Sequence, residues 1–202
     1  MGETENPLQS SDPGEWDRLM QAVNPASLLV AVQMRLGPAL AARYQPEDIL
    51  QEALFSAWRD RLRHNWTGVR GFRAWLLTTI EFRIRDLADH VATVKRGGRA
   101  FQHSLSVPET PEIIQSTTAS RIAGYRQEAS AVLEALRSLP VDQADLIRLR
   151  LIEQMTIPDI ARHLSLGESA VQHRFRKAAE AYQTRLAAIS AQRLGSTEQN
   201  RR

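Results

Sequence analysis

Residues 156–177 constrain the fold of this chain more than any other segment, because they predict two short helices joined by a tight turn. Thr156 and Asp159 have the spacing of a capping box, in which a hydroxyl and a carboxylate each accept a hydrogen bond from a free backbone N–H group. Residues 165–167 form a short connection that ends in glycine. The second helix has an apolar stripe at spacings of three and four residues, formed by Val171, Phe175, Ala178, Tyr182 and Leu186. These features predict a helix-turn-helix.

The polar face of this second helix suits DNA. Arginine and lysine neutralise phosphates or reach guanine, glutamine can bond adenine, and serine can bond either, all from a helix narrow enough for the major groove. A charged outer face is also the default for any solvated helix, so the residues alone leave an ordinary helical hairpin as the alternative. The candidate DNA-reading residues are Glu168, Ser169, Gln172, His173, Arg174, Arg176 and Lys177.

Composition argues against several other function classes. The 202 residues include no cysteine, which removes disulfides, thiolate metal sites and thiol nucleophiles together. The five histidines show no metal-ligand spacing, and the chain has no phosphate-loop lysine motif or nucleophile elbow. No apolar run approaches the length of a membrane span, and the N-terminal residues are acidic. We therefore expect a cytoplasmic protein that is not an enzyme, with no catalytic residue, metal, cofactor, small-molecule substrate or membrane insertion.

Spacings of three and four residues recur almost throughout the chain, whereas sustained alternation of apolar and polar residues is missing. This pattern predicts an all-α fold with two small helical domains joined by a flexible linker, the second domain being a four-helix unit that contains the helix-turn-helix. The expected boundaries are a disordered tail at 1–13, the first helical domain at 14–92, the linker at 93–120, the four-helix unit at 121–189 and a second disordered tail at 190–202.

Two features of the first domain indicate binding. Phe55 is expected on the polar face of a helix over residues 46–63, and an aromatic anchor with a charged rim is typical of protein–protein contacts. Packing of Phe55 against a neighbouring helix is the alternative. Six of the twelve aromatic residues lie between Phe55 and Phe82, interleaved with arginines, which suits the stacking of unpaired bases beside neutralised phosphates. The residue types alone favour a plain aromatic core instead.

With both halves laid out, the chain resembles the sigma factors of bacterial RNA polymerase, specifically the small extracytoplasmic-function type of the sigma-70 family. The first domain matches in PEDILQEALFSAWR at residues 46–59, in FRAWLL at residues 72–77 and in Asp86. The second domain matches in LP at residues 139–140, LR at residues 149–150, TIPDIARHL at residues 156–164 and AVQHRFRKA at residues 170–178. The order and spacing of these motifs are more specific than any one of them.

The resemblance implies a transcription initiation factor and a role for each surface. Docking on the clamp of the polymerase's largest subunit is implied for Asp48, Gln51, Glu52 and Phe55. Capture of flipped bases of the minus-10 promoter element is implied for Asn65, Trp66, Trp75, Thr78, Thr79, Phe82, Arg83 and Arg85. The candidate DNA-reading residues of the helix-turn-helix would read the minus-35 element. The implied partners are core RNA polymerase and promoter DNA, and many relatives are also held by an anti-sigma protein.

The chain departs from the family pattern at four positions. The family often has asparagine where Phe82 stands, glycine at Ser165, and serine or threonine at Gly167 and Ala170. We therefore expect strand opening near Phe82 to rely on different side chains. Two other functions remain open from the sequence. A dimeric helix-turn-helix regulator would bind two-fold symmetric DNA, and a helical adaptor that binds only protein would show no DNA association or a salt-insensitive one.

Overall fold

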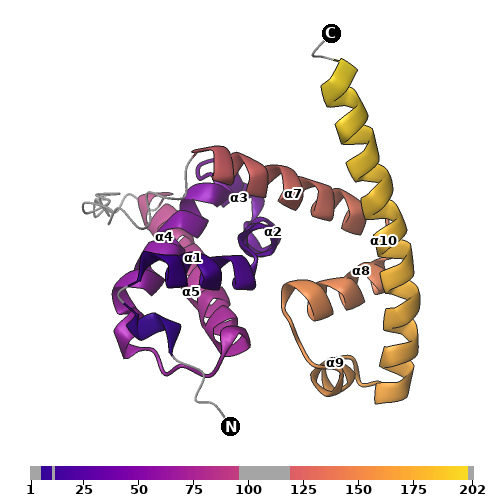
Figure 1. The fold of residues 1–202 in the computed structure, drawn as a ribbon, viewed down its shortest axis with the longest axis horizontal. Coiled ribbons are helices and arrows are strands. Elements are labelled where there is room, and N and C mark those ends of the chain that lie inside the picture. The colour runs from indigo at the N-terminus through magenta and orange to yellow at the C-terminus, as the bar shows by residue number, and fades with distance from the viewer. Residues whose placement is uncertain (1–5, 11, 96–118, 200–202) are drawn as a thin grey trace. The chain divides into compact units, whose positions relative to one another are not determined.

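The computed structural model describes residues 6–10, 12–95 and 119–199, and within these ranges it is helical with no strand (Figure 1). The chain divides into a first unit, Met1–Tyr125, and a second unit, Arg126–Arg202. The expected all-α fold with two helical domains is therefore confirmed. Most of the expected linker at 93–120 lies outside the described residues, but both of its ends are helical, since α5 ends at Lys95 and α7 begins at Ala119.

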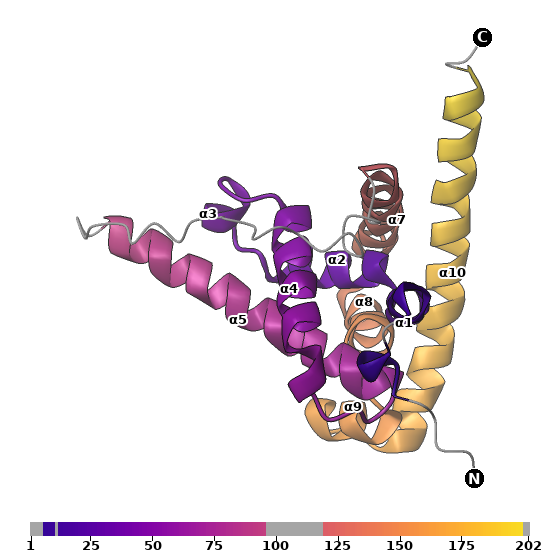
Figure 2. The same ribbon diagram turned by 60° about the vertical axis from the view of Figure 1, so that its left-hand side comes forward.

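Proline begins four successive helices of the first unit, because a missing N–H group and a fixed φ cost nothing at the first helical position. These helices are α1 (Pro13–Val23), α2 (Pro25–Arg35), α3 (Pro38–Ala41) and α4 (Pro46–Asp60). A short helix η2 (Arg61–Arg63) and the long helix α5 (Val69–Lys95) follow. Helix α2 is buried along most of its length, and α4 packs on both α2 and α5 (Figure 2).

Asn24 joins α1 to α2 without any intervening loop residue. Its backbone N–H donates to the carbonyl of Gln21 at the end of α1, 3.2 Å away, and its side chain accepts from the N–H of Ser27 in α2, 3.0 Å away. The residue has a φ of 56°, a left-handed conformation that asparagine tolerates better than most residues. One residue therefore ends one helix and caps the next.

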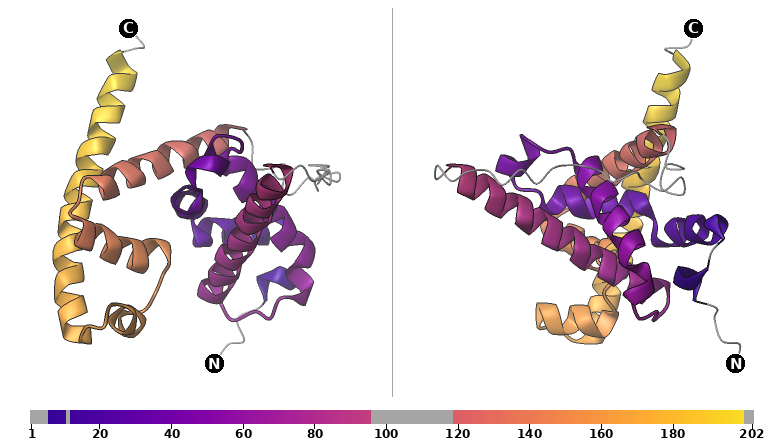
Figure 3. Two further views of the ribbon diagram at one scale, coloured as in Figure 1. Left: turned by 180° about the vertical axis from the view of Figure 1, so that it is seen from behind. Right: turned by 90° about the vertical axis from the view of Figure 1, so that its left-hand side faces the viewer.

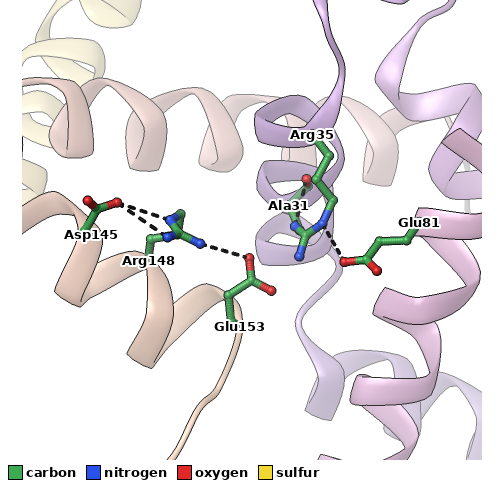
Figure 4. A network of polar contacts seen from close by, with 6 residues as sticks. All are labelled: Ala31, Arg35, Glu81, Asp145, Arg148 and Glu153. Atoms are coloured by element: carbon green, nitrogen blue, oxygen red, sulfur yellow. Dashed lines mark hydrogen bonds and ion pairs between the residues drawn. The ribbon is translucent and has the colours of Figure 1, made fainter. Parts of the chain in front are cut away.

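Arginine side chains connect the helices of the first unit. Arg73 is only 1% exposed and donates to the carbonyl of Val23 at the end of α1. Arg35 of α2 donates to its own helix at Ala31, 3.1 Å away, and pairs with Glu81 of α5 at 3.2 Å (Figure 4). Because Arg73 is buried, its hydrogen bond is the one whose loss would be costly, whereas the Arg35 pair is partly solvated.

The N-terminal segment is more ordered than the sequence indicated. Residues Pro7–Gln9 form a short helix, η1, and Leu8 is 1% exposed. Asn6 caps η1 by accepting from the N–H of Leu8, and Asp12 caps α1 by accepting from Gly14. The expected disordered tail at 1–13 is therefore wrong for the described residues 6–10, 12 and 13, because a single apolar residue in a polar stretch is enough to dock it. Residues 1–5 and 11 lie outside the described residues.

The second unit contains the expected four-helix arrangement. Its elements are α7 (Ala119–Arg137) from Arg126 onward, α8 (Val141–Ile147) with a π-helical continuation η3 (Arg148–Ile152), α9 (Ile157–Leu164) and α10 (Glu168–Gln199). A core of Leu146, Leu149, Ile160, Ala161 and Val171 holds α8, η3, α9 and α10 together. On the outside, Arg148 lies between Asp145 at 3.4 Å and Glu153 at 3.7 Å (Figure 4).

Helix α10 continues past the point where the sequence indicated its end (Figure 3). The expected disordered tail at 190–202 is wrong as far as Gln199, and residues 200–202 lie outside the described residues. Arg193 explains part of the difference, because it donates to the carbonyl of Gln127 at 2.9 Å and to Ser130 at 3.1 Å, and it pairs with Glu134 at 2.8 Å. These contacts to α7 are distant in sequence, so local composition does not reveal them.

Candidate nucleic-acid interface

The predicted helix-turn-helix is present in the second unit. The hydroxyl of Thr156 accepts from the N–H of Asp159 at 3.2 Å, and the carboxylate of Asp159 accepts from the N–H of Thr156 at 3.3 Å, which completes the capping box. Helix α9 ends at Leu164, and the residue that caps it, Ser165, has a φ of 54°. The N–H of Leu166 then donates to the carbonyl of Ala161 at 2.9 Å and closes the turn. The sequence therefore encodes both ends of α9 locally.

The faces of α10 are divided as its periodicity predicted. Val171, Ala178 and Tyr182 are buried, and Phe175 and Leu186 are half-buried. All seven candidate DNA-reading residues are exposed. Within the part of the chain that the structure describes, His173, Arg174, Arg176 and Lys177 form no ion pair. Their charges and hydrogen-bond donors therefore face solvent together on the first turns of the helix, where the groove-reading residues of a helix-turn-helix lie.

The candidate polymerase-docking residues occupy one stretch of α4 but differ in environment. Asp48 and Gln51 are exposed, whereas Glu52 and Phe55 are half-buried. Glu52 pairs with Arg83 of α5, a residue expected to contact the minus-10 element. The two side chains are 25% and 20% exposed, respectively. The structure thus brings together two residues that were expected on different surfaces. The ring of Phe55 is partly packed and partly accessible to solvent.

The loop before α5 spans residues 64–68, since η2 ends at Arg63 and α5 begins at Val69. Gly68 has a φ of 89°, which favours glycine. Gly71 lies inside the helix for a different reason, since a Cβ atom there would come within 1.9 Å of the hydroxyl oxygen of Thr67. We call residues 64–68 the strand loop.

Aromatic rings pack together behind the strand loop. Phe72 is fully buried at the centre, with its ring centroid 6.0 Å from that of His64, 6.2 Å from Trp66 and 5.6 Å from Trp75. The rings of His64 and Trp75 are stacked at 4.4 Å with an angle of 16° between their planes. Phe72 is therefore part of the core, whereas Trp66 and Trp75 are half-buried at its edge.

His64 is held in an environment that disfavours its charged form. Burial lowers the pKa of His64 below its usual 6.5. Its Nε2 atom is buried and finds no hydrogen-bond partner among the described residues. The imidazole therefore acts as a flat, neutral ring against Trp75, which keeps the start of the strand loop close to α5.

Phe82 and Arg85 are exposed neighbours on the part of α5 that belongs to the candidate minus-10 face. Phe82 is 56% exposed, and the guanidinium carbon of Arg85 lies 5.5 Å from the centroid of its ring. The hydroxyls of Thr78 and Thr79 instead donate to carbonyls of their own helix, at 3.1 Å and 3.0 Å. A ring and a cation side by side on one helix can stack on a base and neutralise a phosphate.

Four further residues flank the strand loop and were not among the candidates. Leu62 and Val69 are large apolar side chains that are exposed, and Arg63 and Arg70 are exposed beside them. An apolar residue next to an arginine on each side of a glycine-containing loop was the available sequence signal. Asn65, which was a candidate, is also exposed here.

Neither a cluster of metal ligands nor a membrane-spanning helix is present in the described ranges. No group of three histidine, aspartate or glutamate residues in 6–10, 12–95 and 119–199 is placed to hold a metal ion. None of the helices in the same ranges combines the length and apolarity that crossing a membrane requires.

Two protein-family models match the chain, in the order of its two units. The model described as Sigma-70 region 2 matches residues 26–92. The model described as Sigma-70, region 4 matches residues 129–181. No curated protein matches the chain. The first match covers α2 to most of α5 with the strand loop, and the second covers the helix-turn-helix.

Proposed function

The chain belongs to the sigma-70 family, in its extracytoplasmic-function type, and we propose from this premise that it binds core RNA polymerase and opens the minus-10 region of specific promoters. Membership of this family gives it a role in promoter recognition during transcription initiation. Factors of the family are not enzymes, because the polymerase performs the chemistry. The proposal assigns polymerase docking and single-strand capture to the first unit and duplex recognition to the second.

Helix α4 would dock on the polymerase through Asp48, Gln51, Glu52 and Phe55. Support comes from the position of Phe55, a half-buried ring next to exposed polar residues on one helix. A ring that is already partly ordered loses little side-chain entropy when a partner covers it, so it can serve as an anchor. Arg83 would hold Glu52 in place from α5.

The strand loop and the exposed face of α5 would bind the displaced promoter strand. The observation that supports this best is the pairing of Phe82 and Arg85 on the surface of α5, the helix that also carries the half-buried Trp75. Rings stack on unpaired bases whatever their sequence, and the arginine neutralises the backbone. Phe82 would thereby replace the polar residue that is usual at this position in the family.

Helix α10 would enter the major groove of the minus-35 element. Its first turns present three cationic side chains, Arg174, Arg176 and Lys177, with Gln172 and His173 between the buried positions. The left-handed conformation of Ser165 and the shared core of Ile160 and Val171 would hold α9 and α10 at a fixed angle. A fixed angle matters because a helix-turn-helix reads base edges from a rigid second helix.

Reconstitution tests the proposal. The full chain is mixed with core RNA polymerase and a promoter library, and core binding, duplex binding and strand opening are measured separately. Phe55→Ala should weaken core binding by about 1–3 kcal/mol, the usual cost of truncating an interface anchor. Phe82→Ala is the matched aromatic control, which should keep core binding and lose strand opening. Arg176→Ala should weaken upstream duplex binding by roughly 1–3 kcal/mol, and Arg185→Ala on the same helix should not.

The outcomes separate the proposal from its rivals. Failure of the wild-type chain to associate with core polymerase would refute it. Selection of a two-fold symmetric duplex by the chain alone would favour a dimeric regulator, because a sigma factor selects two different elements. Core binding that Phe55→Ala leaves unchanged would refute the assignment of Phe55, and strand opening that Phe82→Ala leaves unchanged would refute the assignment of Phe82. Either result would leave the family role intact.

A further inference from the structure

Trp16 of α1 packs against the aromatic rings that lie behind the strand loop. It is almost fully buried, and its ring meets that of Trp58 edge to face, with centroids 4.8 Å apart and an interplanar angle of 77°. Its ring also meets that of Phe72, at 6.0 Å and 80°. Trp16 lies outside both regions matched by the family models, which begin at residues 26 and 129.

The ring of Phe72 lies between Trp16 and the strand loop. The same ring touches Trp16 on α1 and the rings of His64 and Trp66 in the loop. It also touches Trp75, on which His64 stacks. Because protein interiors are close-packed, a change in the volume on one side of Phe72 moves the rings on its other side.

A second contact from the N-terminal segment reaches the same place. Helix η1 packs against η2, which directly precedes the strand loop, and the buried Leu8 is the apolar residue of η1. The segment from Asn6 to Val23 therefore supports the strand loop at its beginning through η1 and from behind through Trp16. Burial of Trp16 alone would not require the second contact that η1 makes with η2.

We propose that the N-terminal segment, chiefly through Trp16, is a positioning element that sets the sequence preference of the strand loop for single-stranded DNA. The inference rests on the proposed function, because the loop must bind the displaced strand for its shape to matter. Trp16 acts through Phe72 and does not itself meet the DNA. A residue that is merely part of the core would change the fraction of folded protein, whereas a positioning residue changes the preference among ligands.

The test measures a ratio of affinities, which does not depend on the folded fraction. Holoenzyme is reconstituted from core RNA polymerase and the full chain, and a short single-stranded DNA library of randomised sequence is selected on the wild type. The preference is the ratio of dissociation constants for a scrambled oligonucleotide and the best-enriched one. Trp16→Leu should lower this ratio by roughly two- to tenfold, as the loss of edge-to-face ring contacts allows, and Trp16→Phe should retain it.

A matched control and a second variant keep the test decisive. Leu19→Ala removes a buried side chain from the same helix without removing a ring, and should leave the ratio unchanged. Leu8→Ala should lower it through η2, and this variant decides the question if Trp16→Leu does not fold. An unchanged ratio in both Trp16→Leu and Leu8→Ala, or an equal loss in Leu19→Ala, would overturn the inference. A wild type with no preferred oligonucleotide would instead refute the proposed function of the loop.

Discussion

The ion pair between Glu52 and Arg83 should contribute measurably to the stability of the first unit. A carboxylate and a guanidinium about 4 Å apart attract by about 4 kcal/mol at an effective dielectric constant of about 20. Desolvation of both groups cancels part of this attraction, and well-exposed pairs keep only about 0–1 kcal/mol. The side chains here are 25% and 20% exposed, so they lie between the exposed and the buried cases. We expect a coupling free energy of about 1–2 kcal/mol.

A double-mutant cycle measures this coupling. Glu52→Ala, Arg83→Ala and the double variant are unfolded in urea, and tryptophan fluorescence is followed. All four tryptophans, Trp16, Trp58, Trp66 and Trp75, lie in the first unit, so the signal reports on that unit alone. The cycle also removes the packing contribution of the arginine stem, which each single substitution would include.

Gln51→Ala is the control, because Gln51 is exposed on the same helix and its truncation should change stability by less than about 0.5 kcal/mol. A coupling below about 0.3 kcal/mol would refute the reasoning, since it is the additivity expected of independent sites. The cycle also bears on docking. Loss of polymerase binding in Glu52→Ala is informative only beside Arg83→Ala, which breaks the same pair without truncating a docking residue.

Three further predictions concern other parts of the chain. Ser165→Gly should stabilise the second unit by roughly 0.5–1 kcal/mol, because glycine adopts a φ of 54° without the cost that a Cβ atom brings. Thermal unfolding followed by far-ultraviolet circular dichroism would show a higher melting temperature, and a lower one would contradict the prediction. The lowered pKa of His64 means that the unfolded chain binds more protons below about pH 6.5. Acidification through this range should therefore destabilise the first unit, and His64→Gln should reduce that dependence in tryptophan-monitored unfolding. Arg193→Ala should speed amide hydrogen exchange in residues 190–199 while leaving α9 unchanged, because it removes the contacts to Gln127 and Glu134.

The parts of the structure that the sequence predicted are those that depend on neighbouring residues. Thr156 and Asp159 are three residues apart, so their reciprocal hydrogen bonds follow from local geometry. The stripe of α10 follows from periodicity in the same way. Contacts between distant residues were missed, including the pairing of Glu52 with Arg83 and of Arg193 with α7. No local pattern distinguishes an arginine that faces solvent from one that meets a partner on another helix.

In the candidate site too, the sequence predicts local features but not the packing between distant residues. The sequence indicated an aromatic-rich, basic first domain, but it could not tell Phe72, which is fully buried, from Phe82, which is mostly exposed. Both lie on α5, and the packing of α1, α2, α3 and α4 against that helix decides which ring is covered. The polar N-terminal stretch is more ordered than predicted for a related reason, since the buried Leu8 lies on η1, which packs against η2 and α1.

The shared cap at Asn24 restricts how the length of this chain can vary. A single residue inserted or deleted at that joint would rotate α1 by about 100° relative to α2, the rotation per residue of an α-helix. The rotation would turn Trp16 away from Phe72 and leave a void behind the strand loop. Insertions and deletions should therefore prevent correct folding between α1 and α2. They should be tolerated between α3 and α4, where residues 42–45 form a surface connection that carries none of the rings packed around Phe72. A collection of insertion variants screened for folding would map this joint as a position of fixed length.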